Sequence, residues 1–210
     1  IDGETIAAVL APGSTLLGFD LEANVDTVID AKGKYVIPDG VDAHTHMEMP
    51  FGGTNASDTF ETGTRAAAHG GTTSIVDFIV QYPDQNILDQ YRLWHEKAAG
   101  NCAIDYGFHQ ILSDVQYASL TAMDELIEEG VSSFKLFMAY KGVFLSDDGQ
   151  ILRAFQKGAS NGALMMMHAE NGAMIDVLVK QALEAGNTSP LYHGLTRPWQ
   201  AEEEATHRAI

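Results

Sequence analysis

The stretch Gly40-Val-Asp-Ala-His-Thr-His46 lies where the pattern of the chain changes, and it decides the fold prediction. It follows the turn signal Pro38-Asp39-Gly40 and predicts a short strand, Val41–His46, that ends in two histidines. From here on, apolar strands alternate with amphipathic helices. The other strand candidates begin about thirty residues apart, the length of one strand and one crossover helix; they are Thr72–Val80, Ala103–Leu112, Val131–Ala139 and Ala163–His168.

Helix signals fill the gaps between these strands. Asn86 and Asn171 are suited to cap helices that end at Gly100 and Gly186, and a third helix is closed by Gly130. Repeated units of strand and helix predict a parallel sheet covered by helices. In chain order, the inward faces of these helices are Ile87, Tyr91, Trp94 and Ala98; Leu120, Met123, Leu126 and Ile127; and Ile175, Leu178, Val179 and Ala182.

Two architectures contain such a sheet. A doubly wound sheet binds its ligand at a strand-order reversal, usually over a glycine-rich loop, but Gly70-Gly71 precedes a strand and neither GxGxxG nor GxxxxGK occurs. A (β/α)₈ barrel carries its reactive groups at the carboxyl ends of its strands, where the candidate residues lie. We therefore expect an α/β fold of the TIM-barrel type over residues 39–210, with only about five of the eight βα units present.

Residues 1–38 have a different pattern. Short β-type runs are separated by turn residues, and no helix fits there, so we expect a small piece of antiparallel sheet. The predicted strands are Ile6–Leu10, Leu16–Phe19, Thr27–Asp30 and Tyr35–Ile37.

The composition limits the classes of function. The chain has 210 residues, 45% of them hydrophobic, and 29 Asp and Glu against 12 Lys and Arg give a formal net charge of −17. The basic residues are scattered, so we expect no nucleic-acid or membrane-surface partner. No apolar run approaches the roughly 20 residues that span a bilayer. A single cysteine, Cys102, predicts a reducing, cytoplasmic location.

His44 and His46 close the first strand. Residues two apart in a strand point to the same face, so both imidazoles can reach one metal ion at about 2 Å while Thr45 points away. Such a pair also arises by chance in a chain with eight histidines. Its position at the end of a buried barrel strand favours the metal-ligand interpretation.

Lys135 lies in the middle of the apolar run Val131–Ala139. Burial lowers the pKa of an amine, and a neutral amine can react with CO₂ to give a carbamate, an anionic ligand able to bridge two cations. The alternative is a lysine whose stem is buried and whose head group reaches solvent, and the strand alone favours that alternative.

His168 ends the fifth strand and Tyr140 follows the fourth. A lone histidine beside an apolar run is more often a core residue, but here three strands would each bring a nitrogen ligand to one rim of the barrel. Strict alternation places Tyr140 opposite Lys135, so it reaches the site only if the chain has already turned. Its hydroxyl could then donate to a developing oxyanion; otherwise it packs on a helix.

The other polar candidates are predicted to be structural. Asp77, inside the second strand, is either a buried capping carboxylate or a group that supports the metal ligands, and the first interpretation is favoured. The remaining histidines have no partner at ligand spacing; they are His69, His95, His109, His193 and His207.

Taken together, these segments resemble the dihydropyrimidinase and hydantoinase branch of the cyclic amidohydrolases. The resemblance covers essentially the whole chain and implies two Zn²⁺ ions, with His44 and His46 on one, His168 on the other, and carboxylated Lys135 and a hydroxide bridging them. Tyr140 would orient the substrate and stabilise the oxyanion. The matching segments are Gly40–His46, Met49–Gly53, Gly63–Phe78, Ser133–Lys141 and His168–Gly172.

The resemblance also implies the reaction and its setting. The hydroxide attacks a ring carbonyl of a dihydropyrimidine or hydantoin, and the ring C–N bond breaks to leave an N-carbamoyl amino acid. The full-length protein would be a homotetramer that acts on a small cyclic amide or ureide. Residues 1–38 would be part of a β-sandwich domain, and a further His ligand and an Asp would follow Ile210. We therefore expect a piece of a longer protein, inactive and poorly stable by itself.

Two other functions stay open. One is a non-catalytic, dihydropyrimidinase-related scaffold protein, which resembles the enzyme with its metal residues lost, whereas all four are present here. The other is an allantoinase or dihydroorotase. The dihydroorotase pattern has an arginine two residues after the second histidine to hold the substrate carboxylate, and this chain has Glu48 there.

Overall fold

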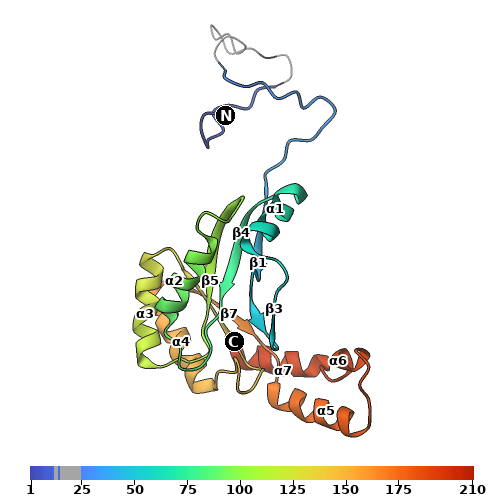
Figure 1. The fold of residues 1–210 in the computed structure, drawn as a ribbon. Helices are drawn as coiled ribbons and strands as arrows, with labels where there is room; N and C mark the ends of the chain where they lie inside the picture. The colour runs from blue at the N-terminus through green and yellow to red at the C-terminus, as the bar shows by residue number, and fades with distance from the viewer. Residues whose placement is uncertain (12–13, 15–24) are drawn as a thin grey trace. The chain divides into compact units, whose positions relative to one another are not determined.

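A parallel five-stranded sheet is the central element of residues 39–210 (Figure 1). In the computed structural model, which describes residues 1–11, 14 and 25–210, the chain divides into two units, Ile1–Pro38 and Asp39–Ile210. All neighbouring strands of the sheet are parallel and follow one another in chain order, which confirms the predicted strands. They are β1 (Gly40–Thr45), β4 (Thr72–Ile79), β5 (Asp105–Ile111), β6 (Ser133–Phe137) and β7 (Leu164–His168).

Four helices connect these strands and cover the sheet. They are α1 (Phe60–Gly70), α2 (Ile87–Ala98), α3 (Tyr117–Glu128) and α4 (Asp148–Asn161), and each contacts the next, so they form one layer. The strand order has no reversal, as in a (β/α)₈ barrel and unlike a doubly wound sheet. None of the described helices is both long and apolar enough to cross a membrane.

The remaining elements lie at the two ends of this unit's sequence. A short hairpin of β2 (Pro50–Phe51) and β3 (Thr54–Asn55) follows β1. Three helices follow β7: α5 (Gly172–Glu184), α6 (Leu191–Leu195) and α7 (Trp199–Ala209). The hairpin was not predicted, because its strands are too short to show an alternating pattern.

Local sequence signals explain where the helices begin. The side chain of Asn86 accepts from Leu88 N at 2.8 Å, and that of Asn171 accepts from Met174 N at 3.0 Å, so both predicted caps are confirmed. Helix α4 was not predicted, although Asp147 begins it with a capping box.

The hydrophobic core lies between the sheet and the helix layer. Side chains alternate along β6, so that Phe134 and Leu136 are fully buried while Lys135 and Phe137 face a cavity on the other side. The predicted helix faces agree in part, since α5 buries only Ile175 of its four inward residues. The core members from the predicted faces of α2 and α3 are Ile87, Trp94, Ala98, Met123 and Leu126.

Three of the four strands predicted before Pro38 do not form among the residues that the structure describes. The described residues of this unit contain only an isolated antiparallel bridge between Asp2 and Thr5. Their apolar side chains are exposed, among them Val9 at 88% and Val36 at 86%, because no partner strand lies against them and a strand without a partner leaves its backbone unpaired. Ile6–Leu10, Thr27–Asp30 and Tyr35–Ile37 are therefore not strands in this structure, and Leu16–Phe19 lies outside the described residues.

Gly172 permits a close backbone approach that leads to the first prediction. A Cβ atom there would lie 2.8 Å from Ala139 Cα and 2.9 Å from Met138 O, and backbone atoms cannot move aside easily. Gly172→Ala should therefore lower the free energy of unfolding of the full-length protein by about 1–3 kcal/mol, measured by chemical denaturation. Gly70→Ala, in α1, is the control, because a Cβ atom at that position would have no neighbour within 4 Å. Equal stability of the two variants would contradict the prediction.

Candidate metal centre

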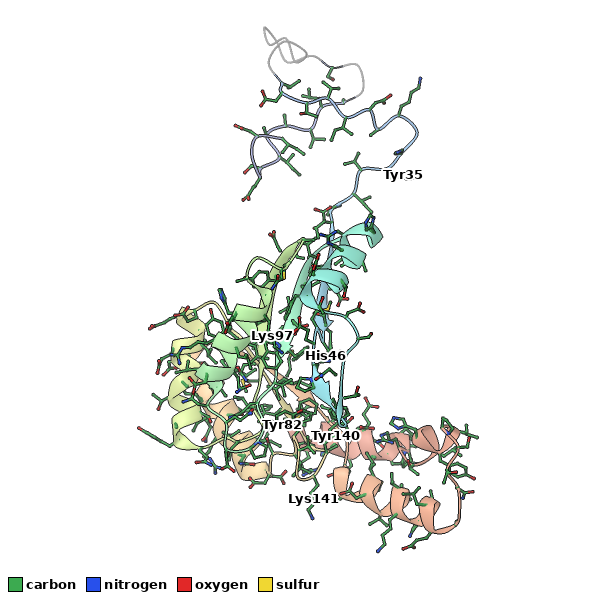
Figure 2. The ribbon with its side chains drawn as sticks, in the orientation of Figure 1. Tyr35, His46, Tyr82, Lys97, Tyr140 and Lys141 are labelled. Atoms are coloured by element: carbon green, nitrogen blue, oxygen red, sulfur yellow. The ribbon has the colours of Figure 1, made fainter. Side chains whose placement is uncertain are left out.

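All the predicted site residues line one cavity of about 480 Å³ at the carboxyl ends of the strands. His44 and His46 come from the end of β1, Lys135 from β6 and His168 from the end of β7, while Tyr140 comes from the loop after β6. Figure 2 labels His46 and Tyr140, which line the same cavity although they are far apart in the sequence. The cavity occupies the position where barrel proteins carry their functional residues.

The two histidines of β1 point to the same side, as their spacing predicts. Their ring centroids are 5.1 Å apart, and they lie 4.6 Å and 5.2 Å from the ring of Phe78. Partial burial lowers the pKa of His46, and the neighbouring His44 and Lys135 lower it further. The neutral imidazole is the form that binds a metal ion.

Lys135 has the environment that the carbamate hypothesis requires. It lines the cavity half-buried, with Nζ 5.5 Å from the centre of the Phe137 ring. Burial lowers the pKa of this amine, because desolvation disfavours the charged form. The Lys135 amine is therefore partly desolvated and faces the cavity.

His168 has one ring nitrogen engaged by a carboxylate, and the other has no hydrogen-bond partner among the described residues. Its Nε2 lies 2.6 Å from Glu170 Oε2, and since a carboxylate only accepts, Nε2 carries the hydrogen in this pair. The lone pair is then on Nδ1, as in sites where a carboxylate orients a metal-binding histidine. Sequence reasoning missed Glu170, although its position two residues after the strand end was a usable signal.

Tyr140 reaches the cavity because the chain has turned before it. Strand β6 ends at Phe137, and Tyr140 has a φ of 64°, in the left-handed region that few side chains adopt. Its carbonyl oxygen accepts from the backbone N–H groups of Val143 and Phe144, both at 3.0 Å, which stabilises the turn. Its ring lies 5.3 Å from that of His168.

An aromatic group that sequence reasoning did not identify forms one side of the cavity. Phe144 stacks on Phe137 at 5.1 Å and on Phe51 at 5.9 Å. Phe51 is brought there by the β2–β3 hairpin, which is fastened by a hydrogen bond of 2.5 Å from the Tyr82 hydroxyl to Pro50 O. The cavity thus combines a nitrogen-rich side with an apolar one.

Of the histidines predicted to be structural, His109 borders the site. It is 8% exposed, its Nε2 donates to Ala43 O at 3.0 Å, and its Nδ1 accepts from the Ser133 hydroxyl. Burial lowers its pKa most strongly, His44 and Lys135 lower it further, and the bond to Ala43 opposes them. With both nitrogens engaged within the protein, His109 links three strands and has no lone pair left for a metal.

The three candidate histidines do not gather around a single ion position. Among the residues that the structure describes, no three His, Cys, Asp or Glu side chains come together as a metal-binding group. The candidate ligands instead combine three histidines with Lys135 around one cavity.

The parallel strands in chain order, their helix layer and a cavity at the strand ends define a partial (β/α)₈ barrel. A sequence model of the amidohydrolase family matches residues 35–195, and the chain belongs to this family.

Individual relatives agree with this assignment. The chain is 62% identical over 211 residues to a D-hydantoinase of Streptomyces coelicolor, covering 100% of this chain and 44% of that protein. It is 50% identical to a D-hydantoinase of Geobacillus stearothermophilus, covering 92% of this chain and 41% of the relative. A solved dihydropyrimidinase from Brevibacillus agri superposes with a TM-score of 0.88 at 50% identity, covering 90% of this chain and 41% of that chain. The chain thus spans about two fifths of the length of these relatives.

The lowered pKa of Lys135 predicts a pH-dependent stability. Between the lowered value and the ordinary value of 10.5, the folded state binds fewer protons than the unfolded chain, so stability rises with pH in that range. Lys135→Met should therefore raise the melting temperature of the metal-free, full-length protein at neutral pH, and the gain should shrink toward about pH 10.

The matched control is Lys180→Met, because the Lys180 side chain is 77% exposed on α5. Melting temperatures of both variants and the parent, followed by circular dichroism across this pH range, test the prediction. A gain for Lys135→Met that is independent of pH would contradict it.

Proposed function

We propose that the protein to which this chain belongs is a zinc-dependent cyclic amidohydrolase that opens the ring of a dihydropyrimidine or hydantoin. The observation that carries this proposal is the convergence of His44, His46, Lys135 and His168 on one cavity, with Tyr140 beside His168. The names D-hydantoinase and dihydropyrimidinase of the similar proteins support the substrate class.

The donors of this cavity suit a pair of Zn²⁺ ions. His44 and His46 would bind one ion and His168 Nδ1 the other, while the Lys135 amine, once it has added CO₂ and released a proton, would provide a bridging carbamate. The lowered pKa of Lys135 supports this step, because only the neutral amine reacts with CO₂. Bound zinc would supply a hydroxide at neutral pH and polarise the ring carbonyl.

The other side chains would bind and orient the ring. The Tyr140 hydroxyl would donate to the carbonyl oxygen as negative charge develops on it. Phe51, Phe137 and Phe144 would exclude water around the ring. Hydrolysis would join a hydroxide oxygen to the carbonyl carbon and break the ring C–N bond, and the released nitrogen would take a proton, giving an N-carbamoyl amino acid.

The competing functions have less support. A non-catalytic scaffold would not need four nitrogen-bearing side chains around one cavity. For a dihydroorotase, the position after the histidine pair should hold a substrate carboxylate, but Glu48 is itself acidic. Its carboxylate lies 3.8 Å from Lys97 Nζ, and Glu48 is not among the residues that line the cavity.

The cellular setting stays a prediction. We propose a homotetramer in the cytoplasm, in keeping with the single free cysteine, Cys102, which burial makes a weak acid by raising its pKa to about 11.

The direct test is metal content and activity of the full-length protein. We expect about two zinc ions per chain and hydrolysis of dihydrouracil, hydantoin or both. Bound zinc is measured by atomic absorption and ring opening by the loss of ultraviolet absorbance. A protein that neither binds zinc nor opens either ring would refute the proposal.

The bridging role of Lys135 has its own test. Lys135→Ala should abolish activity, because no carbamate can form, and acetate or propionate should restore part of it by occupying the bridging position. The control is Lys141→Ala, which removes a nearby lysine that does not line the cavity. Full activity of Lys135→Ala without added acid would exclude the bridging role.

A further inference from the structure

A buried carboxylate outside the cavity holds the end of β1. Asp77, on β4, is 0% exposed. Its Oδ2 accepts from Thr45 Oγ1 at 2.9 Å and from Met47 N at 2.7 Å, while its Oδ1 accepts from Trp94 Nε1 at 3.2 Å. Asp77 itself does not line the cavity.

These contacts involve the residues directly before and after His46, one of the candidate metal ligands. Thr45 separates His44 from His46, and Met47 follows His46, so a single carboxylate oxygen fixes the chain before and after His46. Thr45 and Asp77 are also partners in the register of β1 and β4. Because Thr45 points away from the cavity, fixing its side chain fixes the direction in which both imidazoles point.

Neighbouring elements hold the same turn. Met47 packs so closely on α1 that a Cβ on Gly63 would lie 2.3 Å from the Met47 sulfur. Glu48 has a φ of 52°, and its carboxylate lies 3.8 Å from Lys97 Nζ, which itself lies 4.5 Å from the Trp94 ring. The turn after His46 is therefore tied to α1, α2 and β4 at once.

The burial of Asp77 has an energetic cost that these bonds offset. Desolvation raises the pKa of Asp77 to about 6, and the hydrogen bonds from Met47, Thr45 and Trp94 oppose that rise. A cap for one backbone group would not require a fully buried carboxylate with three donors from different elements.

We propose that Asp77 is a positioning residue, which acts through Thr45 and Met47 to aim His44 and His46 at a metal ion. This inference rests on the zinc site of the proposed function. It selects, for Asp77, the role of supporting the metal ligands in addition to capping backbone groups.

The test compares zinc affinities of full-length variants that share the same ligands. Thr45→Val keeps the shape and strand preference of the side chain but removes its donor, and Asp77→Asn replaces one acceptor oxygen by a donor. Both should weaken Zn²⁺ binding to the metal-free protein about 10- to 100-fold, measured by competition with a chromogenic chelator. Thr45→Ser, which keeps the hydroxyl, should retain nearly the parent affinity.

A matched control separates positioning from general loss of stability. Thr64 on α1 is also 0% exposed, and its hydroxyl accepts from Ala103 N at 3.0 Å, away from the histidine pair. Thr64→Val should lower the melting temperature without changing zinc affinity. Hydrogen exchange of the metal-free protein gives an independent measurement, because loss of the Asp77 carboxylate should speed exchange of the Met47 amide.

The outcomes distinguish this inference from the proposed function. Weaker zinc binding in Thr45→Val and Asp77→Asn, with rescue by Thr45→Ser and an unchanged Thr64→Val, supports it. If the parent binds zinc and these variants bind it equally well, the positioning role is wrong while the proposed function stands. If the parent binds no zinc, the proposed function fails and the inference fails with it, whatever the exchange rate of Met47.

Discussion

The alternation of side chains across β6 is the constraint on which the site depends. Phe134 and Leu136 must face the helices to complete the core, so Lys135 necessarily faces the cavity. The register also fixes the position of Lys135 along the strand direction, because Lys135 pairs with Ile111 of β5 and with Met166 of β7. A slip of one residue would bury the amine in the core and expose two apolar side chains. The same alternation of side chains therefore completes the core and directs Lys135 into the cavity.

Strand β1 is held in a different way. Its register with β4 shifts twice, so backbone pairing with β4 alone defines its position less sharply than a regular ladder would. Hydrogen bonds from buried polar side chains also fix the position of β1. Asp77 bonds to Thr45 and Met47 from β4, and His109 bonds to Ala43 from β5 while accepting from Ser133 of β6. Buried polar groups are costly unless every hydrogen-bond partner is in place. These bonds therefore favour one position of β1 over positions that would leave a partner unsatisfied.

Local patterns made much of this predictable, and non-local contacts account for the rest. The five strands and the caps at Asn86 and Asn171 could be predicted from periodicity and short-range hydrogen bonds. The candidate site residues could be predicted because barrel proteins carry functional residues at the carboxyl ends of their strands. The approach of Phe51 and the links made by His109 depend on strand register and on turns that no short stretch of sequence specifies. The pairing of His168 with Glu170, two residues apart, was within reach of local reasoning. The three strands expected before Pro38 that fall on described residues are absent for a related reason, since a strand pattern specifies a face but not the partner that must cover it.

The conformation of Tyr140 has a consequence for comparing members of this family. A left-handed backbone disfavours most residues with a Cβ, at a cost of typically about 1 kcal/mol or more. Glycine, which has no Cβ, or asparagine, whose short side chain can hydrogen-bond locally, would lower that cost. Tyr140 therefore adopts a backbone conformation that its residue type disfavours. In a relative that does not use the hydroxyl, substitution of this tyrosine by glycine or asparagine would stabilise the fold without loss of function. Under the proposed function, the residue type at this position would indicate, without a structure, whether a family member uses the phenol.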